Sequence, residues 1–306
     1  MSELKGAKAE TPPGSPPSPV ARFYLLGRPV TASLSPAMHN AAFRALGLRA
    51  RYDPVDVGPE DFERVAREFI SRDDFAGANV TIPHKRVAMN LCATVSPEAA
   101  AAKAVNTLVR GLIGHNTDVT AVRALLSPHR PAGKGGTALL IGAGGVAAAV
   151  AVALSGMGLE RLVVANRSEP SAASLAEMSR GLGLPAETTR LDRRTLGAWL
   201  AAPGLVAVIN ATPLKEPDEW EPLGLGEAWA SAFGSPAVAL DLAYRTKPTF
   251  FLEVAARAGS RTIDGREVLI AQGAAAFELW TGRKAPIEVM REAVYRQADP
   301  APRSAG

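Results

Sequence analysis

The chain has 306 residues, which is longer than an average domain and long enough for two. Hydrophobic residues make up 47% and charged residues 21%, a globular composition that excludes a wholly disordered chain, a disulfide scaffold and a coiled coil. The net charge of +4 is dispersed, since no basic run exceeds two residues, and aromatic residues make up only 6%. This balance favours an enzyme that meets small anionic molecules over a nucleic-acid-binding protein.

Cysteine usage and the N-terminal composition indicate a cytoplasmic protein without a membrane span. Cys92 is the only cysteine, so no internal disulfide can form, and its apolar sequence neighbours predict a packed thiol. Residues 1–19 lack the apolar core of a signal peptide and are rich in proline, which predicts a flexible tail over residues 1–20. Residues 135–159 carry no charge, but glycines divide them into a short strand and a helix, so we expect no membrane span.

Short apolar stretches alternate with helical patterns along most of the chain. The first series predicts strands at residues 22–26, 51–55 and 77–82, helices at 36–46 and 59–70, and a helix that opens at Pro83. The second series predicts strands at residues 137–141, 162–165, 206–210 and 237–241, with helices such as 147–154 and 171–182. Residues 268–281 and 287–298 are predicted to be helical.

This alternation predicts the α/β class, with two lobes that each hold a mostly parallel sheet. The predicted division is a tail at 1–20, a lobe at 21–118, a second lobe at 119–263, helices at 264–298 and a tail at 299–306. A small-molecule site is expected in the cleft between the lobes.

A glycine-rich segment, Gly142-Ala143-Gly144-Gly145-Val146-Ala147, follows a predicted strand and opens a predicted helix, the context that a dinucleotide site requires. The first glycine allows a tight turn, the second lets backbone amides approach a pyrophosphate, and Ala147 lets helix and strand pack. Phosphates would lie at the positive end of the helix. The alternative is that these glycines serve a plain turn.

The end of the next strand distinguishes NAD from NADP. An acidic residue there would bind the ribose 2′-hydroxyl, whereas an arginine accommodates a 2′-phosphate. The segment reads Asn166-Arg167-Ser168, so no acidic residue ends the strand, although Glu169 follows closely. Arg167 offers a planar fork suited to phosphate, which favours NADP. A solvated loop arginine is the alternative.

Polar residues of the first lobe have two interpretations each. Lys85 would lie near the start of the helix predicted at Pro83, where a cation is unfavourable by up to about 1 kcal/mol. It is either a tolerated surface lysine or a functional group, and His84 is expected to be a surface residue. Asp118 or Thr117 either caps the following helix or faces a site.

Nine short segments occur in order along the chain. The first four are Ser33-Leu34-Ser35-Pro36-Ala37-Met38-His39-Asn40, Asn79-Val80-Thr81-Ile82-Pro83-His84-Lys85, Ala104-Val105-Asn106-Thr107 and Asn116-Thr117-Asp118. The others are the glycine-rich segment, Asn166-Arg167-Ser168, Asn210-Ala211-Thr212-Pro213, Asp241-Leu242-Ala243-Tyr244 and residues 272–280. Together they resemble the shikimate dehydrogenase family, from about residue 23 to residue 289.

The resemblance implies NADPH-dependent, reversible reduction of 3-dehydroshikimate to shikimate in aromatic amino acid biosynthesis. It implies a substrate-binding first lobe, a Rossmann-like NADP-binding second lobe, and C-terminal helices that return to the first lobe. Lys85 and Asp118 match the catalytic pair. The positions matching substrate-binding residues are Ser33, Ser35, Thr81, Asn106, Asp118, Tyr244 and Gln272. The positions matching cofactor-binding residues are Gly142, Ala143, Gly144, Gly145, Val146, Ala147, Asn166, Arg167, Ser168, Thr212 and Gly265.

The sequence departs from the family pattern at three places. Ala121 stands where glycine is usual, and Lys215-Glu216 and Glu267-Val268 each replace a Gly-Met pair. Both pairs belong to loops that lie near the nicotinamide in the family. Glu267 is therefore expected to bring a carboxylate toward the cofactor, unless it points into water.

The sequence thus predicts a cytoplasmic, NADP-dependent oxidoreductase, a monomer or homodimer that binds small molecules but no metal, nucleic acid or membrane. An NAD-dependent dehydrogenase for quinate or another shikimate analogue is an alternative, since it would share most of these residues. A diverged relative that binds nucleotide or shikimate without turnover is a second alternative. The departures motivate it, and the presence of both Lys85 and Asp118 argues against it.

Overall fold

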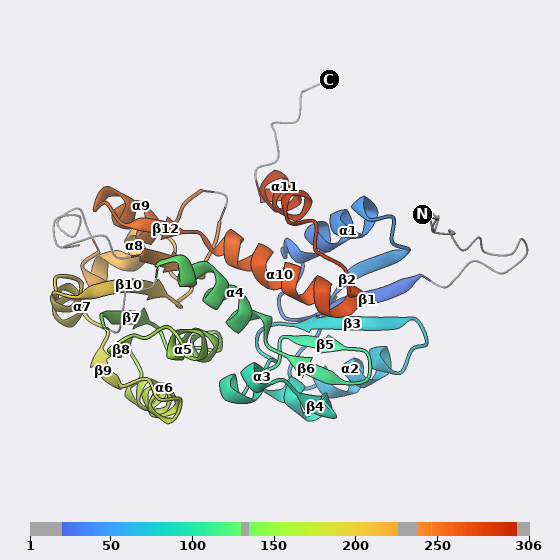
Figure 1. The fold of residues 1–306 in the computed structure, drawn as a ribbon, viewed down its shortest axis with the longest axis horizontal. Coiled ribbons are helices and arrows are strands. Elements are labelled where there is room, and N and C mark those ends of the chain that lie inside the picture. Colours follow the sequence, from blue (N-terminus) through green and yellow to red (C-terminus); the bar gives the residue numbers. More distant parts are fainter. Residues whose placement is uncertain (1–19, 130–134, 226–237, 246, 299–306) are drawn as a thin grey trace, which may run out of the picture.

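The first lobe is built on a mixed sheet that has six strands among the described residues (Figure 1). The computed structural model describes residues 20–129, 135–225, 238–245 and 247–298. The strand order is β2-β1-β3-β5-β6-β4. These strands are β1 (Ala21–Gly27), β2 (Ala50–Asp56), β3 (Phe75–Val80), β4 (Thr94–Val95), β5 (Thr107–Val109) and β6 (Ile113–His115). The helices of this lobe are α1 (Ser35–Ala45), α2 (Phe62–Ile70) and α3 (Pro97–Ala102).

The second lobe holds another six-stranded sheet within the described part of the chain, in the order β12-β11-β10-β7-β8-β9. The strands are β7 (Thr137–Ile141), β8 (Arg161–Asn166), β9 (Ala186–Arg190), β10 (Leu205–Asn210), β11 (Val238–Asp241) and β12 (Arg261–Ile263). The helices are α5 (Ala147–Ser155), α6 (Glu169–Gly181), α7 (Arg193–Leu200), α8 (Pro217–Trp220) and α9 (Phe250–Arg257).

The α/β class and the two lobes are confirmed, with one difference in strand direction. All five neighbouring pairs of the second sheet are parallel among the described residues, as expected. In the first sheet, β5 runs antiparallel to both β3 and β6. A short hairpin, too brief to show a clear sequence period, therefore extends the parallel strands.

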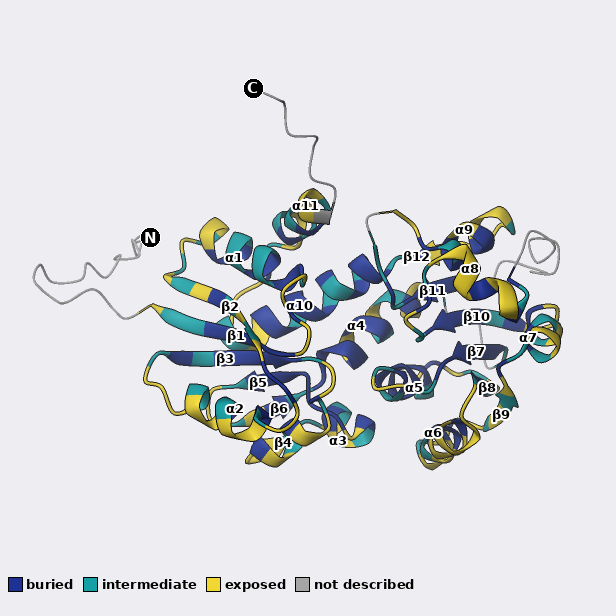
Figure 2. Cartoon of the chain, turned by 180° about the vertical axis from the view of Figure 1, so that it is seen from behind, coloured by how far each residue is buried: buried dark blue, intermediate teal, exposed yellow. Residues whose placement is uncertain are grey.

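The central strand of the second sheet explains where a ligand would bind. All residues of β7 are buried, as its unbroken apolar pattern requires for a strand covered on both faces (Figure 2). β7 lies between β8 and β10, so the order of the strands reverses there. Ligands of open α/β sheets bind outside the carboxyl ends of the strands at such a point. The glycine-rich segment begins directly after β7, at this edge.

The helices after β12 connect the two lobes. α10 (Gly265–Thr281) starts at the second lobe and runs back across the first, beside α4 (Thr117–Leu126), and α11 (Ile287–Ala298) lies against α1 (Figure 1). Phe277 of α10 is fully buried and its ring lies 5.5 Å from that of Phe43. The return of the C-terminal helices to the first lobe is confirmed.

The predicted helix at Pro83 is wrong. The segment after β3 is a turn with a cis Ile82–Pro83 peptide bond, and only a 3₁₀ helix over Val87–Leu91 follows. The carbonyl of Lys85 accepts a hydrogen bond from the amide of Val105 at 2.8 Å. This carbonyl is therefore bonded to a segment distant in the chain and not to a helical turn. Lys85 therefore does not face the electrostatic cost that a helix N-terminus would impose on a cation.

Other expectations concern the tails, the apolar segment and the cysteine. Apart from Val20, the predicted tails 1–20 and 299–306 lie outside the described residues. No helix in the described ranges is both long and apolar enough to cross a membrane.

Cys92 is partly buried and donates to the carbonyl of Ala88 at 3.3 Å, and burial raises the pKa of its thiol to about 11. These contacts support a packed thiol.

Candidate active site

Lys85 and Asp118 form a close ion pair, although they lie 33 residues apart. Lys85 Nζ donates to Asp118 Oδ2 at 2.7 Å, and the two side chains are only 16% and 11% exposed. The cap of α4 is Asn116, whose side chain accepts a hydrogen bond from the amide of Val119 at 3.3 Å. Asp118 is therefore not needed as a cap, and its carboxylate holds the lysine.

A buried hydrogen-bond network adjoins this pair. Asn106 Oδ1 accepts from the amide of Thr117 at 2.8 Å and from the hydroxyl of Thr107 at 3.0 Å. The Thr117 hydroxyl also lies 3.4 Å from Gln272 Oε1, and the Gln272 amide donates to the Leu269 carbonyl at 2.9 Å. The network joins the chain before β5 to α4 and α10. It brings Asn106 and Gln272 together with the turn of α4 that carries Asp118.

Three residues with hydroxyl groups lie beyond the carboxyl ends of β1 and β3: Ser33, Ser35 and Thr81. These two strands are parallel and pair at Leu26 and Val80. Ser33 Oγ accepts from the Ser35 amide at 3.2 Å, at the start of α1. A Cβ on Gly27 would lie 2.2 Å from the Thr81 methyl group, so glycine is needed where Thr81 packs. All three residues therefore follow strands that end at the same edge of the sheet, and Lys85 follows β3 at that edge too.

His84 is not the surface residue expected from the sequence. It is 2% exposed, its Nε2 lies 2.8 Å from the Val57 carbonyl, and its ring stacks on Phe62 with centroids 4.2 Å apart. Its ring thus fixes the turn that precedes Lys85. Sequence reasoning missed it because Val57 is 27 residues away and Phe62 belongs to α2.

Tyr244 brings the second lobe to the first. It follows β11, is partly buried, and packs against the core of the first lobe. Burial raises the pKa of its phenol. Its packing places it across the boundary between the lobes, on the side of α10.

The glycine-rich loop has the shape that a bound pyrophosphate needs. Gly142 has φ +102°, and a Cβ there would lie 3.0 Å from the backbone of Ala211, so a side chain is excluded. Gly144 and Gly145 would meet no atom within 4 Å, which leaves their backbone open in front of α5. Ala147, the first residue of α5, is fully buried against the sheet. The residues present therefore fit a dinucleotide.

The neighbouring loops complete this edge. Asn166 donates to the Ser168 carbonyl at 2.9 Å, which shapes the loop after β8. Arg167 is exposed and forms no ion pair with any described residue. Thr212 donates from its amide and its hydroxyl to Asn210 Oδ1, at 2.9 and 2.6 Å. Gly265 packs so tightly that a Cβ would lie 2.7 Å from the carbonyl of Ala243.

Known proteins are similar to this chain both in sequence and in architecture. Family models match residues 25–108 (shikimate dehydrogenase substrate binding domain), 128–193 (shikimate / quinate 5-dehydrogenase) and 265–295 (shikimate 5′-dehydrogenase C-terminal domain). A shikimate dehydrogenase (NADP(+)) of Moorella thermoacetica is 43% identical over 280 residues, which span 90% of this chain and 92% of that protein. The chain belongs to the shikimate dehydrogenase family.

Further members of the family are similar to this chain in sequence and in structure. The shikimate dehydrogenase (NADP(+)) of Methanopyrus kandleri is 41% identical over 276 residues, 88% of this chain and 93% of its own length. The crystal structure of shikimate 5-dehydrogenase from Thermus thermophilus, in complex with NADP(H) and shikimate, has a TM-score of 0.76 and 37% identity. That comparison covers 90% of this chain and 99% of the other.

The departure from the family at Lys215-Glu216 is accommodated by a short helix. Both backbone amides donate to Glu219 Oε2, at 2.6 and 2.8 Å, and these bonds lower the pKa of Glu219. Glu216 also pairs with Arg245. The loop between Thr212 and α8 therefore ends in fixed hydrogen bonds at the two positions where a Gly-Met pair is usual in the family.

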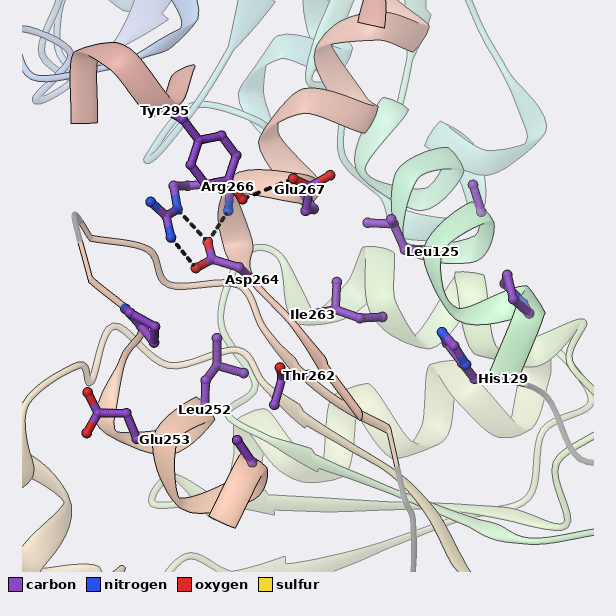
Figure 3. Close-up of a pocket in the computed structure, with 14 residues that line it drawn as sticks. Leu125, His129, Leu252, Glu253, Thr262, Ile263, Asp264, Arg266, Glu267 and Tyr295 are labelled. Atoms are coloured by element: carbon purple, nitrogen blue, oxygen red, sulfur yellow. Dashed lines mark hydrogen bonds and ion pairs between the residues drawn. The ribbon is translucent and has the colours of Figure 1, made fainter. Parts of the chain in front are cut away.

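Glu267, which is expected to bring a carboxylate toward the cofactor, has its carboxylate bound by residues of α11. In the first turn of α10, Glu267 Oε2 accepts from Arg291 at 3.0 Å and its Oε1 accepts from the Tyr295 hydroxyl at 3.0 Å. Figure 3 shows Glu267 beside Tyr295 on the wall of a cavity of about 640 Å³. Glu267 does not point freely into water either, because α11 supplies partners that the sequence order does not reveal.

A buried carboxylate, Asp241, supports the loop of Thr212. Asp241 Oδ1 accepts from Asn210 Nδ2 at 2.8 Å and from the Ala243 amide at 2.9 Å, and Oδ2 accepts from the Thr249 hydroxyl. Burial raises the pKa of this carboxyl to about 7. Asn210 and Asp241 end the paired strands β10 and β11, so their positions as the last polar residue of each strand are the signal that could have linked them.

Proposed function

We propose that the protein catalyses the reversible, NADPH-dependent reduction of 3-dehydroshikimate to shikimate. The observation that carries this proposal is the Lys85–Asp118 pair, with Nζ and Oδ2 2.7 Å apart, at the edge of a sheet lined with hydroxyl and amide groups. The glycine-rich loop on the other lobe supplies the complementary cofactor cradle. Relatives named shikimate dehydrogenase (NADP(+)), at 41% and 43% identity, support it.

Lys85 supplies the charge and the proton that the reaction needs. NADPH, when bound, supplies the hydride that reduces the substrate ketone. The carbonyl oxygen gains negative charge during reduction, and the Lys85 ammonium stabilises that charge and donates a proton to the oxygen. In the reverse direction Lys85 accepts the proton from the substrate hydroxyl. Asp118 orients the lysine and accepts a hydrogen bond from a substrate hydroxyl.

The other first-lobe residues would bind the rest of the substrate. Ser33 and Ser35 have hydroxyls that donate to a carboxylate without adding charge, and both lie at the start of α1. Thr81, Asn106 and Gln272 offer donors and acceptors for ring hydroxyls. Tyr244 closes the site from the second lobe.

The cofactor would lie along the carboxyl edge of the second sheet. Residues 142–147 would receive the pyrophosphate at the start of α5. Asn166, Arg167 and Ser168 would receive the adenosine ribose and its 2′-phosphate, while Thr212 and Gly265 would lie toward the nicotinamide. Because Arg167 has no described ion-pair partner, its guanidinium is available for phosphate.

We also propose the lobe boundaries 21–118, 119–263 and 264–298, a cytoplasmic location, and a monomer or homodimer. The first of these boundaries falls in the first turn of α4, the helix that follows the first sheet and precedes the second. The free thiol of the single cysteine, Cys92, suits a reducing compartment.

The proposal is tested by initial rates with shikimate and with quinate, each with NADP⁺ and with NAD⁺. We expect shikimate with NADP⁺ to give the highest kcat/KM. Faster oxidation of quinate with NAD⁺ would assign the alternative activity. Binding of shikimate and NADP⁺ in calorimetry without turnover in any combination would identify a relative that binds but does not catalyse.

Replacing Glu267 with glutamine should affect stability but not the balance between cofactor forms. The Glu267–Arg291 pair is partly exposed, so its loss should lower the free energy of unfolding by about 1 kcal/mol or less. Because the carboxylate is directed toward α11, the ratio of the NADP⁺ and NADPH dissociation constants should stay the same. Fluorescence titration with both forms, beside urea unfolding, measures the two effects.

The matched control for this prediction is Glu292→Gln, which removes the same charge from an exposed pair with Arg296 on α11. It should change neither quantity measurably. A dissociation-constant ratio that shifts in Glu267→Gln but not in Glu292→Gln would restore Glu267 to the cofactor site.

A further inference from the structure

A second arginine shares a cavity with Arg167. Arg190 is the last residue of β9, and the strand register pairs it with Asn166 at the end of β8. Arg167 and Arg190 both line a cavity of about 450 Å³. Arg167 and Arg190–Asp192 lie at the carboxyl ends of β8 and β9, the same edge of the sheet at which the glycine-rich loop follows β7.

The carboxylates around this cavity are bound by backbone amides, which leaves both arginines available to bind an anion. The lining also contains Asp192 and Glu219. Asp192 Oδ1 accepts from the Thr195 amide at 2.9 Å and caps α7, and Glu219 Oε2 accepts from two backbone amides. Backbone hydrogen bonds lower the pKa of both carboxyls, so they remain charged but are held in place.

Arg190 is held much less firmly than these carboxylates. Its side chain is 83% exposed, and its contact with Asp192 spans 4.0 Å. An exposed pair at that distance contributes little energy. The guanidinium can therefore reorient toward an anion in the cavity at small cost. Such a planar fork binds phosphate oxygens through paired N–H donors.

The remaining lining suits the rest of an adenosine. Leu191, Pro222 and Leu223 contribute apolar surface to the same cavity. Two guanidinium groups beside an apolar wall match a purine nucleoside that carries a phosphate on its ribose, and they do not match an unphosphorylated ribose. A 2′-phosphate carries up to two negative charges, which one arginine alone leaves partly uncompensated.

We propose that Arg190 is a second cofactor-specificity residue, which binds the 2′-phosphate of NADP together with Arg167. This inference rests on the proposed NADP-dependent function and deepens it. Sequence reasoning considered only the loop after β8 and did not consider the end of the neighbouring strand. Arg190 would discriminate NADP from NAD, and it would take no part in the chemical step.

The test compares Arg190→Ala with Arg167→Ala and with Arg194→Ala. Arg194 is an exposed arginine on α7 that does not line the cavity, so its replacement is the control for loss of charge. Dissociation constants are measured by calorimetry for NADP⁺, NAD⁺, 2′,5′-ADP and 5′-AMP. The two fragments report on the 2′-phosphate without any contribution from the nicotinamide or from catalysis.

Arg190→Ala is expected to weaken NADP⁺ and 2′,5′-ADP about 10- to 100-fold, as loss of a charge-assisted contact does, and to leave NAD⁺ and 5′-AMP unchanged. Arg167→Ala should show the same selectivity, and Arg194→Ala should match wild type. If wild type prefers NADP⁺ but Arg190→Ala behaves like Arg194→Ala, the role of Arg190 is refuted. Equal losses for all four ligands would also refute it. If wild type itself binds NAD⁺ as tightly as NADP⁺, the proposed cofactor is wrong instead.

Discussion

Replacing Lys85 with alanine is expected to lower kcat by about 10²–10⁴-fold, the usual contribution of a general acid–base group. Lys85 Nζ is held 2.7 Å from Asp118 Oδ2 in a site where both side chains are largely buried. Alanine removes both the proton donor and the positive charge that stabilises the developing alkoxide. Shikimate should still bind, because Ser33 and Ser35 are unchanged. Steady-state kinetics and calorimetric titration with shikimate separate the two quantities.

Two further variants make the assignment specific. Asp118→Asn should also lower kcat, and it should weaken shikimate binding more than Lys85→Ala does, because an acceptor for a substrate hydroxyl is lost. Lys284→Ala removes a positive charge from an exposed lysine and should leave both constants as in wild type. A Lys85→Ala enzyme whose kcat stays close to that of Lys284→Ala would show that another group transfers the proton.

The stability of the protein is expected to fall steeply in acid because of His39. Its ring is fully buried between aromatic side chains, 4.5 Å from Tyr52 and 5.2 Å from Trp280. Both ring nitrogens are without a hydrogen-bond partner among the described residues. Burial lowers the pKa of His39 from 6.5 to about 3, because the cation would be left without solvent or a counter-charge.

The direction of the pH effect follows from this shift. Between pH 6.5 and about 3 the unfolded chain binds a proton on His39 that the folded protein does not bind. The destabilisation is therefore absent above the unfolded pKa, and the free energy of unfolding falls by up to about 1.4 kcal/mol per pH unit as the pH drops through this window. His39→Phe keeps a flat ring and removes the titration, so its stability should depend less on pH. Urea unfolding from pH 7 to 4 measures the slopes.

His129→Phe is the matched comparison, since His129 is partly exposed and its pKa is lowered by a smaller burial. It should change the slope less than His39→Phe. A second measurement does not depend on any variant: the ring signals of His39 in the folded protein should show no titration by NMR between pH 7 and 5. Protonation of folded His39 in that range would contradict the prediction.

The helices and strands whose bounds were predicted closely are those with a clear hydrophobic pattern in their own sequence. β7 (Thr137–Ile141) and α11 (Ile287–Ala298) begin and end where the sequence predicted, because an unbroken apolar run and a clear helical period mark them. β4 has two residues, and β5 and β6 have three each, so they are too short to carry a period. The Pro83 segment failed because tertiary hydrogen bonding of Lys85 replaced the local preference for a helix.

For the candidate site too, the sequence predicted residue types but not the contacts that form only through the fold. Residue types and order identified Lys85 and Asp118 as partners by resemblance, but no spacing rule connects residues that meet only through the fold. The orientation of Glu267 was missed because Arg291 and Tyr295 approach it from another helix. Arg190 was missed because the register of two strands, and not the sequence, brings it beside the loop after β8.

The path of α10 has a consequence for the order in which the protein can be completed during synthesis. Ile270, Ala274 and Phe277 of α10 belong to the same buried cluster as Phe23 and Phe43 near the start of the chain. The first lobe is therefore translated first but cannot close its core until residues 265–298 have left the ribosome. Until then its apolar face is open to solvent and to chaperones, while the second lobe, whose sheet is contiguous in sequence, can already fold.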